Sequence, residues 1–324
     1  MKSHLNPNLH KKNIEMIPTR NGYGDGLVEA GKRDKDVVAI TADLAESTRS
    51  DRFQKIFPDR FFDCGVAEQN MMGVAAGLAR EGKIPFVSSY AVFSPGRNWD
   101  QLRTNVCYND VPVKIAGSHT GISVGPDGAT HQGLEDIALT RVLPNLIVIA
   151  PCDYLETKKA TLAAAKLKKP IYIRFTRHKT AVITTRRTPF KIGKAEVFQP
   201  GDDVSIVATG PLVYEALLVA KKLAKEKISV EVINSHTIKP LDEKTIISSA
   251  KKTGCVVTVE EHQINAGAGS AVMECLAENY PVPVERVGMP DAFGESGKPD
   301  ELLKKYGLCC EGIEAAIKKV IKRK

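Results

Sequence analysis

Short runs of apolar and β-branched residues alternate with helix-like segments along the first 176 residues of this chain. The strand-like runs lie at 37–41 (VVAIT), 61–64 (FFDC), 84–90 (IPFVSSY), 111–117 (VPVKIAG), 146–151 (LIVIAP) and 171–176 (IYIRFT). Strands separated by helices are typical of a doubly wound α/β sheet whose strands are mostly parallel. In such a sheet the ligand site lies beyond the carboxyl ends of the strands, so we expect function in the loops there.

A second and smaller unit repeats this pattern after a stretch at 184–200 (TTRRTPFKIGKAEVFQP) that indicates a linker. Its strand-like runs lie at 204–210, 229–237, 255–261 and 282–289, and two helices are expected at its end. We therefore expect two α/β domains, 1–188 and 189–324. The GAGS sequence at 267–270 lacks the third glycine of a dinucleotide fingerprint and indicates a tight strand-to-helix turn.

The segment from Phe61 to Arg80 (FFDCGVAEQNMMGVAAGLAR) places a single acidic residue, Glu68, where a helix is about to begin. Apolar residues follow Glu68 at helical spacing with small residues between them, so this helix can approach its neighbours closely. A carboxylate in such surroundings is poorly solvated, which suits a group that shares or passes a proton near neutral pH. The alternative is an ordinary first-turn acid that favours the helix dipole.

Polar residues gather in the loops that follow the expected strands. The glycine-rich loop SHTGISVGPDGATHQ carries His119, Asp127 and His131, which suit proton transfer and recognition of sugar-like hydroxyls. Four arginines offer guanidinium groups for a phosphate, with a hydroxyl donor from Ser47: Arg20, Arg97, Arg174 and Arg177. The aromatic residues Tyr90 and Phe93 close a strand, where they either face a ligand ring or pack in the core.

Charge and composition limit the classes of ligand that this chain is expected to bind. There are 46 basic and 38 acidic residues, a formal net charge of +8, but the lysines are spread along the chain without interleaved aromatics. This favours phosphorylated metabolites over nucleic acid. No apolar run approaches the ~20 residues of a membrane span. Seven cysteines lack a CxxC or metal-like spacing and no hydrophobic leader precedes MKSHLNPNLHKK, so we expect reduced thiols, a cytoplasmic location and no metal site in this chain.

Several longer motifs resemble one known family. They are GVAEQNMMGVAAGLA, SSYAVF, WDQLR, GSHTGISVGPDGATHQGLED, IRFTR, TIKPLD and SGKPDELLKKYGL. Together they resemble the C-terminal half of a thiamine-diphosphate-dependent transketolase from about Arg20 to the end of the chain. The resemblance implies a pyrimidine-binding domain over 1–188 and a transketolase C-terminal domain over 189–324. It also implies a transferase of the pentose phosphate pathway that moves a two-carbon ketol unit from a ketose phosphate to an aldose phosphate.

The resemblance also implies roles for individual residues. Glu68 would hold N1′ of the cofactor's aminopyrimidine, promoting the imino tautomer, while Tyr90 and Phe93 would form its aromatic pocket. His131 would lie near the reacting carbon, and Asp127 at a donor or acceptor hydroxyl. The remaining matches are to substrate-phosphate contacts: Arg20, Ser47, His119 and Arg177. Arg97 and Arg174 receive no role from the resemblance.

The chain lacks the family's diphosphate-binding half. Full-length members carry a GDG motif and a later Asn that complete a Mg²⁺ site. Here the GDG at 24–26 lies at a helix start, with no preceding apolar strand and no Asn about 25 residues on, so we interpret it as unrelated. The resemblance therefore implies one subunit of a split enzyme. A separate N-terminal subunit would hold the diphosphate and most of the Mg²⁺ contacts, in a heterotetramer of two plus two chains.

Three alternatives remain open from the sequence. The first is 1-deoxyxylulose-5-phosphate synthase, which shares the GVAEQ and DGATHQ patterns. The second is the β-subunit of a 2-oxo acid dehydrogenase, which is also a free-standing C-terminal half. TIKPLD, SGKPDELL and the phosphate-site arginines favour transketolase over both. The third is a non-catalytic relative that only binds a partner, which has no need to retain Glu68, Asp127 and His131 together.

Overall fold

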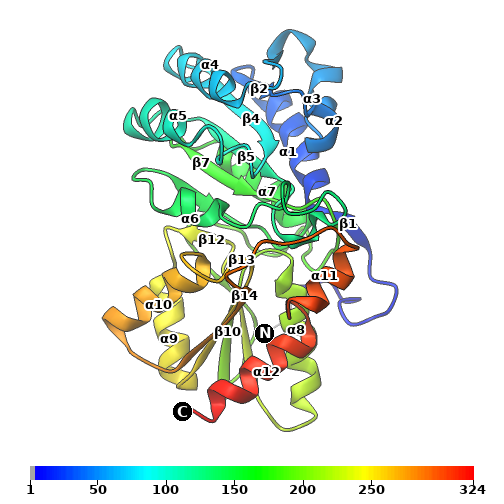
Figure 1. Cartoon of the computed structure of the whole chain (residues 1–324), viewed down its shortest axis with the longest axis vertical. Coiled ribbons are helices and arrows are strands. Elements are labelled where there is room, and N and C mark those ends of the chain that lie inside the picture. The colour runs from blue at the N-terminus through cyan, green and yellow to red at the C-terminus, as the bar shows by residue number, and fades with distance from the viewer. Residues whose placement is uncertain (1–3) are drawn as a thin grey trace.

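A seven-stranded sheet organises the first half of the chain in the computed structural model, which describes residues 4–324 (Figure 1). The strand order is β12-β6-β7-β5-β4-β2-β3, and every neighbouring pair is parallel except β12 with β6. The strands are β2 (Val37–Thr41), β3 (Phe61–Asp63), β4 (Ile84–Tyr90), β5 (Lys114–Ser118), β6 (Ile147–Ile149), β7 (Ile171–Arg174) and β12 (Thr237–Lys239). The expectation of a doubly wound, mostly parallel sheet is confirmed.

Helices cover both faces of this sheet (Figure 1). On one face lie α1 (Thr19–Arg33), α3 (Asp51–Ile56) and α7 (Tyr154–Ala165). On the other lie α4 (Glu68–Arg80), α6 (Asp136–Arg141) and a helical segment composed of α5 (Trp99–Gln101) and a π-helix (Leu102–Tyr108). Shorter elements are β1 (Met16–Pro18) paired with β8 (Lys179–Ala181), α2 (Ala45–Thr48), and 3-10 turns at Pro58–Arg60 and Ile122–Val124.

Glycines in α1 allow it to pack tightly on α7. A Cβ at Gly22 would overlap the carbonyl oxygen of Tyr154, and one at Gly26 would lie 2.8 Å from the Cβ of Thr161. Between these glycines, Asp25 accepts a hydrogen bond from the Tyr154 hydroxyl at 2.6 Å and pairs with Arg52. Helix packing and this ion pair therefore account for the GDG sequence at 24–26.

The second sheet has the order β14-β13-β10-β11-β9, with only β9 antiparallel to its neighbour. Its strands are β9 (Glu196–Gln199), β10 (Val204–Ala208), β11 (Val230–Asn234), β13 (Val256–Gln263) and β14 (Val284–Met289). One face packs on α8 (Leu212–Ala224) and α12 (Cys310–Ile321), and the other on α9 (Glu243–Thr253) and α10 (Ala268–Asn279). The remaining helix, α11 (Pro299–Lys305), packs against the 3-10 turn at 122–124.

Two strands depart from the expected layout. The 184–200 stretch is not only a linker, because β9 pairs with β11 at the edge of the second sheet. Soon after β11, the chain returns to the first sheet, where β12 pairs antiparallel with β6. The TIKPLD motif contains this strand, so it joins the two sheets. No described helix is long and apolar enough to cross a bilayer.

The GAGS turn is confirmed as a structural strand-to-helix connection. Gly267 is the N-cap of α10, and the carboxylate of Glu260 accepts the backbone N–H groups of Ala268 (2.7 Å) and Gly269 (2.8 Å). A Cβ at Gly267 would overlap this carboxylate. Since Glu260 occupies the anion-binding end of the helix, the turn serves packing rather than a dinucleotide phosphate.

Buried acidic residues lie where α7 meets the second sheet. Asp153 caps α7, accepting hydrogen bonds from Glu156 N (2.8 Å) and Thr184 N (2.6 Å). Glu156 accepts from Cys152 N (2.7 Å) and from the side-chain amide of Asn234 on β11 (2.8 Å). Complete burial, together with the nearby charge of Asp153, raises the pKa of Glu156 to about 7.

Candidate active site

The predicted site residues converge at one edge of the first sheet. Because parallel strands end on the same side, the segments after β3, β4, β5 and β7 meet there. They carry Glu68, Phe93, the loop 119–133 and Arg177, respectively, and Tyr90 is the last residue of β4. Arg20 at the start of α1 and Ser47 in α2 join the same edge through the hydrogen bond from Arg20 Nη1 to the Ser47 carbonyl oxygen (2.9 Å).

Glu68 is the first residue of α4 and its side chain is only 1% exposed. The expected poor solvation of this carboxylate is therefore confirmed. It is not alone, however, because Arg97 Nη1 donates to Glu68 Oε2 at 2.9 Å. The side chain of Asn98 also donates to the Glu68 carbonyl oxygen at 3.2 Å, which fixes the start of α4. Arg97, left without a role in the sequence analysis, is thus the direct partner of the central acid.

Four rings form a continuous cluster beside Glu68. Tyr90 stacks on His119 with ring centroids 3.8 Å apart, and lies nearly parallel to Phe93 at 6.0 Å. The edge of His131 meets Phe93 at 5.6 Å, while the Arg97 guanidinium lies over Phe93 at 4.8 Å. Tyr90 and Phe93 remain partly exposed. They are therefore not fully buried in the core, and their rings are available to a ligand.

His119 is held as a neutral ring. Burial, with added repulsion from Arg20 and Arg177, lowers its pKa to about 3. Its Nδ1 lies 2.8 Å from the hydroxyl of Ser118. The ring can therefore offer a hydrogen bond to a ligand, but it does not supply positive charge at neutral pH.

Positive charge comes instead from a group of arginines. Burial and the proximity of Arg49 and Arg177 lower the pKa of Arg20 to about 10. The Nε of Arg20 is buried without a hydrogen-bond partner, so the site has an unused donor. Arg49 also lies here, because its backbone is left-handed (φ 71°) at the end of α2 and its Nε donates to Asn21 Oδ1 (3.1 Å). Both features depend on the fold, so the sequence did not indicate this residue.

Two residues expected to recognise substrate pair with each other. Arg177 Nη1 lies 2.9 Å from Asp127 Oδ1, and their side chains are 40% and 29% exposed. On the same loop, His131 Nδ1 is 2.9 Å from the hydroxyl of Thr130. Asp127 and Arg177 are thus near enough for one to influence ligand binding by the other.

The prediction that Arg174 is a candidate phosphate ligand is wrong. Its guanidinium is 3% exposed and donates to both carboxylate oxygens of Asp136, at 2.8 and 3.1 Å. The Tyr172 hydroxyl donates to the same carboxylate at 2.8 Å. Arg174 belongs to β7 itself rather than to the following loop, so its side chain is enclosed between the strand and α6. Its donors are consequently unavailable to a ligand.

The geometry fits an aminopyrimidine ring and an anionic group. A buried carboxylate beside partly exposed aromatic faces matches the hydrogen-bonding and stacking needs of such a ring. Arginines with a free buried donor match a phosphate. Among residues 4–324, no cluster of three or more His, Cys, Asp or Glu side chains is arranged to hold a metal ion.

Two consecutive α/β domains, the first of which carries this edge site, are the arrangement of the pyrimidine-binding and C-terminal parts of a thiamine-diphosphate-dependent enzyme. Family models agree: the transketolase pyrimidine-binding domain matches residues 15–182, and the transketolase C-terminal domain matches residues 193–313. The chain belongs to the transketolase family, whose domains imply dependence on thiamine diphosphate.

Similar proteins include separate transketolase sections. A putative transketolase C-terminal section from Methanocaldococcus jannaschii is 47% identical over 94% of this chain and 96% of its own length. A 6-deoxy-6-sulfo-D-fructose transketolase subunit from a Clostridium species is 43% identical over 94% and 95%. A split-gene transketolase solved as an inactive β4 tetramer matches 95% of this chain and 99% of its own, with 45% identity and a TM-score of 0.89. The prediction of a split-type C-terminal section of transketolase is confirmed at this level.

Proposed function

We propose that this chain is the C-terminal subunit of a split transketolase. Together with a separate diphosphate-binding subunit, it would transfer a two-carbon ketol unit from a ketose phosphate to an aldose phosphate. The observation that carries the proposal is the continuous path of contacts from Glu68 through Arg97, Phe93 and Tyr90 to His119. It links a site suited to an aminopyrimidine with one suited to a phosphorylated sugar. The reaction would belong to the pentose phosphate pathway in the cytoplasm.

Glu68, Tyr90 and Phe93 would hold the aminopyrimidine of thiamine diphosphate. The cofactor, when bound, supplies the nucleophilic carbon of ketol transfer. Glu68 would hold a proton at a ring nitrogen, and its burial would keep water from competing for this hydrogen bond. Arg97 is half exposed, so it can release Glu68 Oε2 by moving toward solvent. His131, at the edge of Phe93, would act as a proton donor or acceptor near the reacting carbon.

The phosphate of the sugar would lie among Arg20, Ser47, His119 and Arg177. Arg20 has the unused buried Nε, and the neutral His119 ring can donate without adding charge. We add Arg49 to this group because its charge influences both Arg20 and His119. Asp127 would accept a substrate hydroxyl. The Clostridium relative is described as acting on a sulfonated sugar, so a sulfonate is a second anion worth testing here.

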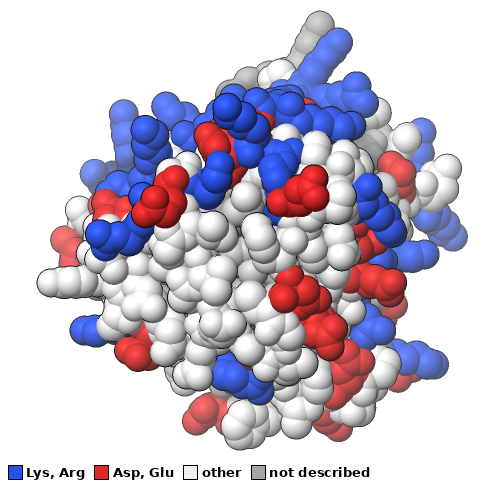
Figure 2. Space-filling view, turned by 90° about the horizontal axis from the view of Figure 1, so that it is seen from above, with Lys and Arg blue, Asp and Glu red and all other residues white. Residues whose placement is uncertain are grey.

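The outer face of α4 supports docking of the second subunit. Gly73 and Gly77 lie there one helical turn apart, and a Cβ built on either would meet no atom within 4 Å. Val74 on the same helix is 38% exposed, and Val66, just before the helix begins, is 71% exposed. Viewed from the end that carries α4, the middle of the molecule has few charged side chains, whereas lysines and arginines crowd one rim (Figure 2). A diphosphate-binding subunit packing here would bring its cofactor half, with Mg²⁺, next to Glu68.

Reconstitution tests the proposal. The chain would be assayed for ketol transfer with thiamine diphosphate and Mg²⁺, alone and after co-purification with a diphosphate-binding section from the same genome. We expect no turnover from the isolated chain and turnover from a complex of two plus two chains. Robust activity of the chain alone would refute the split arrangement. A stable complex that transfers no ketol unit from phosphorylated or sulfonated ketoses would refute the proposed function.

A further inference from the structure

The loop 119–133 carries three of the proposed substrate residues but has little regular structure of its own. It contains one 3-10 turn at Ile122–Val124 and is closed at its base by a bridge between Thr120 and Gly133. Glycines with positive φ, Gly121, Gly125 and Gly128, interrupt it. Such a segment has many backbone conformations available, so its shape must be fixed by contacts from outside.

The first such contact comes from Glu261 on β13 of the C-terminal domain. Its carboxylate is buried, and Oε1 accepts the backbone N–H of Ser123 at 2.7 Å. A Cβ at Gly121 would overlap this carboxylate, so the loop approaches Glu261 more closely than any other residue at 121 would permit. The 3-10 turn is therefore anchored to the second sheet rather than to its own domain.

The second contact comes from the segment between β14 and α11. Gln132 donates from Nε2 to the carbonyl oxygen of Glu295 at 2.9 Å, and also toward Ile122 O and Gly125 O within the loop. A Cβ at Gly294 would overlap the Gln132 side chain. Gln132 therefore links the two halves of the loop to each other and to the C-terminal domain.

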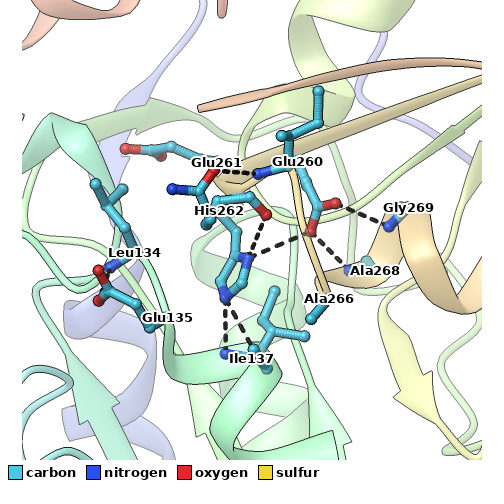
Figure 3. Close-up of polar contacts among 12 residues, drawn as sticks. Leu134, Glu135, Ile137, Glu260, Glu261, His262, Ala266, Ala268 and Gly269 are labelled. Carbon is cyan, nitrogen blue, oxygen red and sulfur yellow. Dashed lines mark hydrogen bonds and ion pairs between the residues drawn. The ribbon is translucent and has the colours of Figure 1, made fainter. Parts of the chain in front are cut away.

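The start of α6, which follows the loop, is also held by the C-terminal domain. The His262 ring accepts the backbone N–H of Ile137 at 3.2 Å at the start of α6, and its Nδ1 donates to Gln263 O (Figure 3). Figure 3 also shows that the side chains of Glu260 and Glu261 point in opposite directions from β13. Glu260 accepts a hydrogen bond from the start of α10 within its own domain, whereas Glu261 accepts one from the loop 119–133.

We propose that the C-terminal domain acts as a positioning element for substrate, with Glu261 and Gln132 as its positioning residues. This inference rests on the proposed function and extends it, because neither residue touches the expected sugar. Releasing either contact would let Asp127 and His131 move relative to the rings of Tyr90 and Phe93, which lie outside the loop. Displacements of about 1 Å in a catalytic arrangement can cost ~100-fold in rate, so we expect kcat/KM to fall by roughly 10- to 100-fold.

Adjacent glutamates of equal burial provide the matched test. In the reconstituted enzyme, Glu261→Ala is compared with Glu260→Ala, because each of the two residues is 2% exposed. We expect Glu261→Ala to lower kcat/KM for sugars while the affinity for thiamine diphosphate stays the same. Glu261→Gln, which keeps an oxygen for Ser123, should restore most of the loss. Glu260→Ala should lower thermal stability without this kinetic effect.

A second variant covers the case in which Glu261→Ala does not fold. Gly294→Ala pushes on Gln132 from the C-terminal domain, and Asp291→Ala, an exposed position on the same segment, is its control. Amide hydrogen exchange of residues 119–133, measured by mass spectrometry in every variant, needs no activity. We expect faster exchange there in Glu261→Ala and Gly294→Ala only.

Three results would overturn the inference. One is unchanged loop exchange in both Glu261→Ala and Gly294→Ala, and another is unchanged kcat/KM in both. The third is an equal kinetic loss in Glu260→Ala, which would make Glu261 merely structural. A wild-type complex without ketol transfer would instead refute the proposed function, and loop exchange would still decide whether the C-terminal domain holds the loop.

Discussion

Replacing Arg177 by alanine should separate recognition of the sugar phosphate from recognition of sugar hydroxyls. The guanidinium of Arg177 is 40% exposed and pairs with Asp127 at 2.9 Å, an arrangement whose contribution to folding is typically only ~0.2–1 kcal/mol. A charge-assisted hydrogen bond to a phosphate is worth more, ~1.5–3 kcal/mol, or roughly 10- to 100-fold in KM. We therefore expect KM for phosphorylated sugars to rise by that factor, with a smaller fall in kcat and nearly normal stability.

The Asp127 pair makes a double-mutant cycle informative. Asp127→Ala should penalise phosphorylated and unphosphorylated sugars alike through the lost hydroxyl contact. It also frees Arg177 from its ion pair, so the effects of the two substitutions should not add for phosphorylated sugars. For unphosphorylated sugars, where Arg177 has no ligand group to bind, the double variant should resemble Asp127→Ala alone.

Steady-state kinetics of the reconstituted enzyme with matched phosphorylated and unphosphorylated ketoses measures the wild type and the three variants of the cycle. Arg186→Ala, an exposed arginine in the connection between the domains, is the control for loss of one positive charge. Equal damage to both substrate classes by Arg177→Ala would refute the phosphate assignment. It would mean that Arg177 holds Asp127 or a subunit interface instead.

Four further predictions concern the central acid, helix packing, subunit assembly and pH. Glu68→Gln should slow exchange of the cofactor C2 proton in the reconstituted enzyme by ~10²–10⁴-fold, measured by NMR, and a wild-type exchange rate would make Glu68 structural. Gly22→Ala should lower the free energy of unfolding by ~1–3 kcal/mol through overlap with Tyr154, measured by denaturant titration. Gly73→Ala should leave the isolated chain at least as stable but weaken subunit assembly, measured by sedimentation. The pKa of about 7 at Glu156 exceeds its ordinary value, so its stabilising contribution is full below about pH 4.5 and is lost as pH rises through about 7. Between about pH 5 and pH 8 the wild type should lose up to about 3 kcal/mol more than Glu156→Gln, and parallel pH profiles would contradict this.

Local pattern was enough to locate the sheet and its functional edge. Apolar runs of strand length alternate with helical spacing, and parallel strands end on one side, so Tyr90, His119 and Arg177 could be assigned to the same edge. The burial of Glu68 also followed from sequence, because small and apolar residues surround it along the helix. Both inferences depend on neighbours within about one helical turn or one strand, where spacing alone fixes which side chains share a face.

Other features required the folded chain. Arg174 and Arg177 lie three residues apart, yet one is enclosed with Asp136 and the other faces the site. The difference lies in where β7 ends, which the sequence does not mark sharply. Arg49 reaches the proposed phosphate site only through a left-handed turn, and no local signal distinguishes it from a surface arginine.

The sequence by itself therefore determined the α/β architecture, and it predicted the edge of the candidate site and most of the residues that the fold brings together there. Tertiary structure alone decided the pairings: Glu68 with Arg97, Asp127 with Arg177, and Ser123 with Glu261. It also decided that β12 returns to the first sheet. These contacts join residues 29, 50 and 138 positions apart in the chain. Periodicity records only which face of an element is apolar, whereas the partner of a polar side chain depends on how distant elements pack.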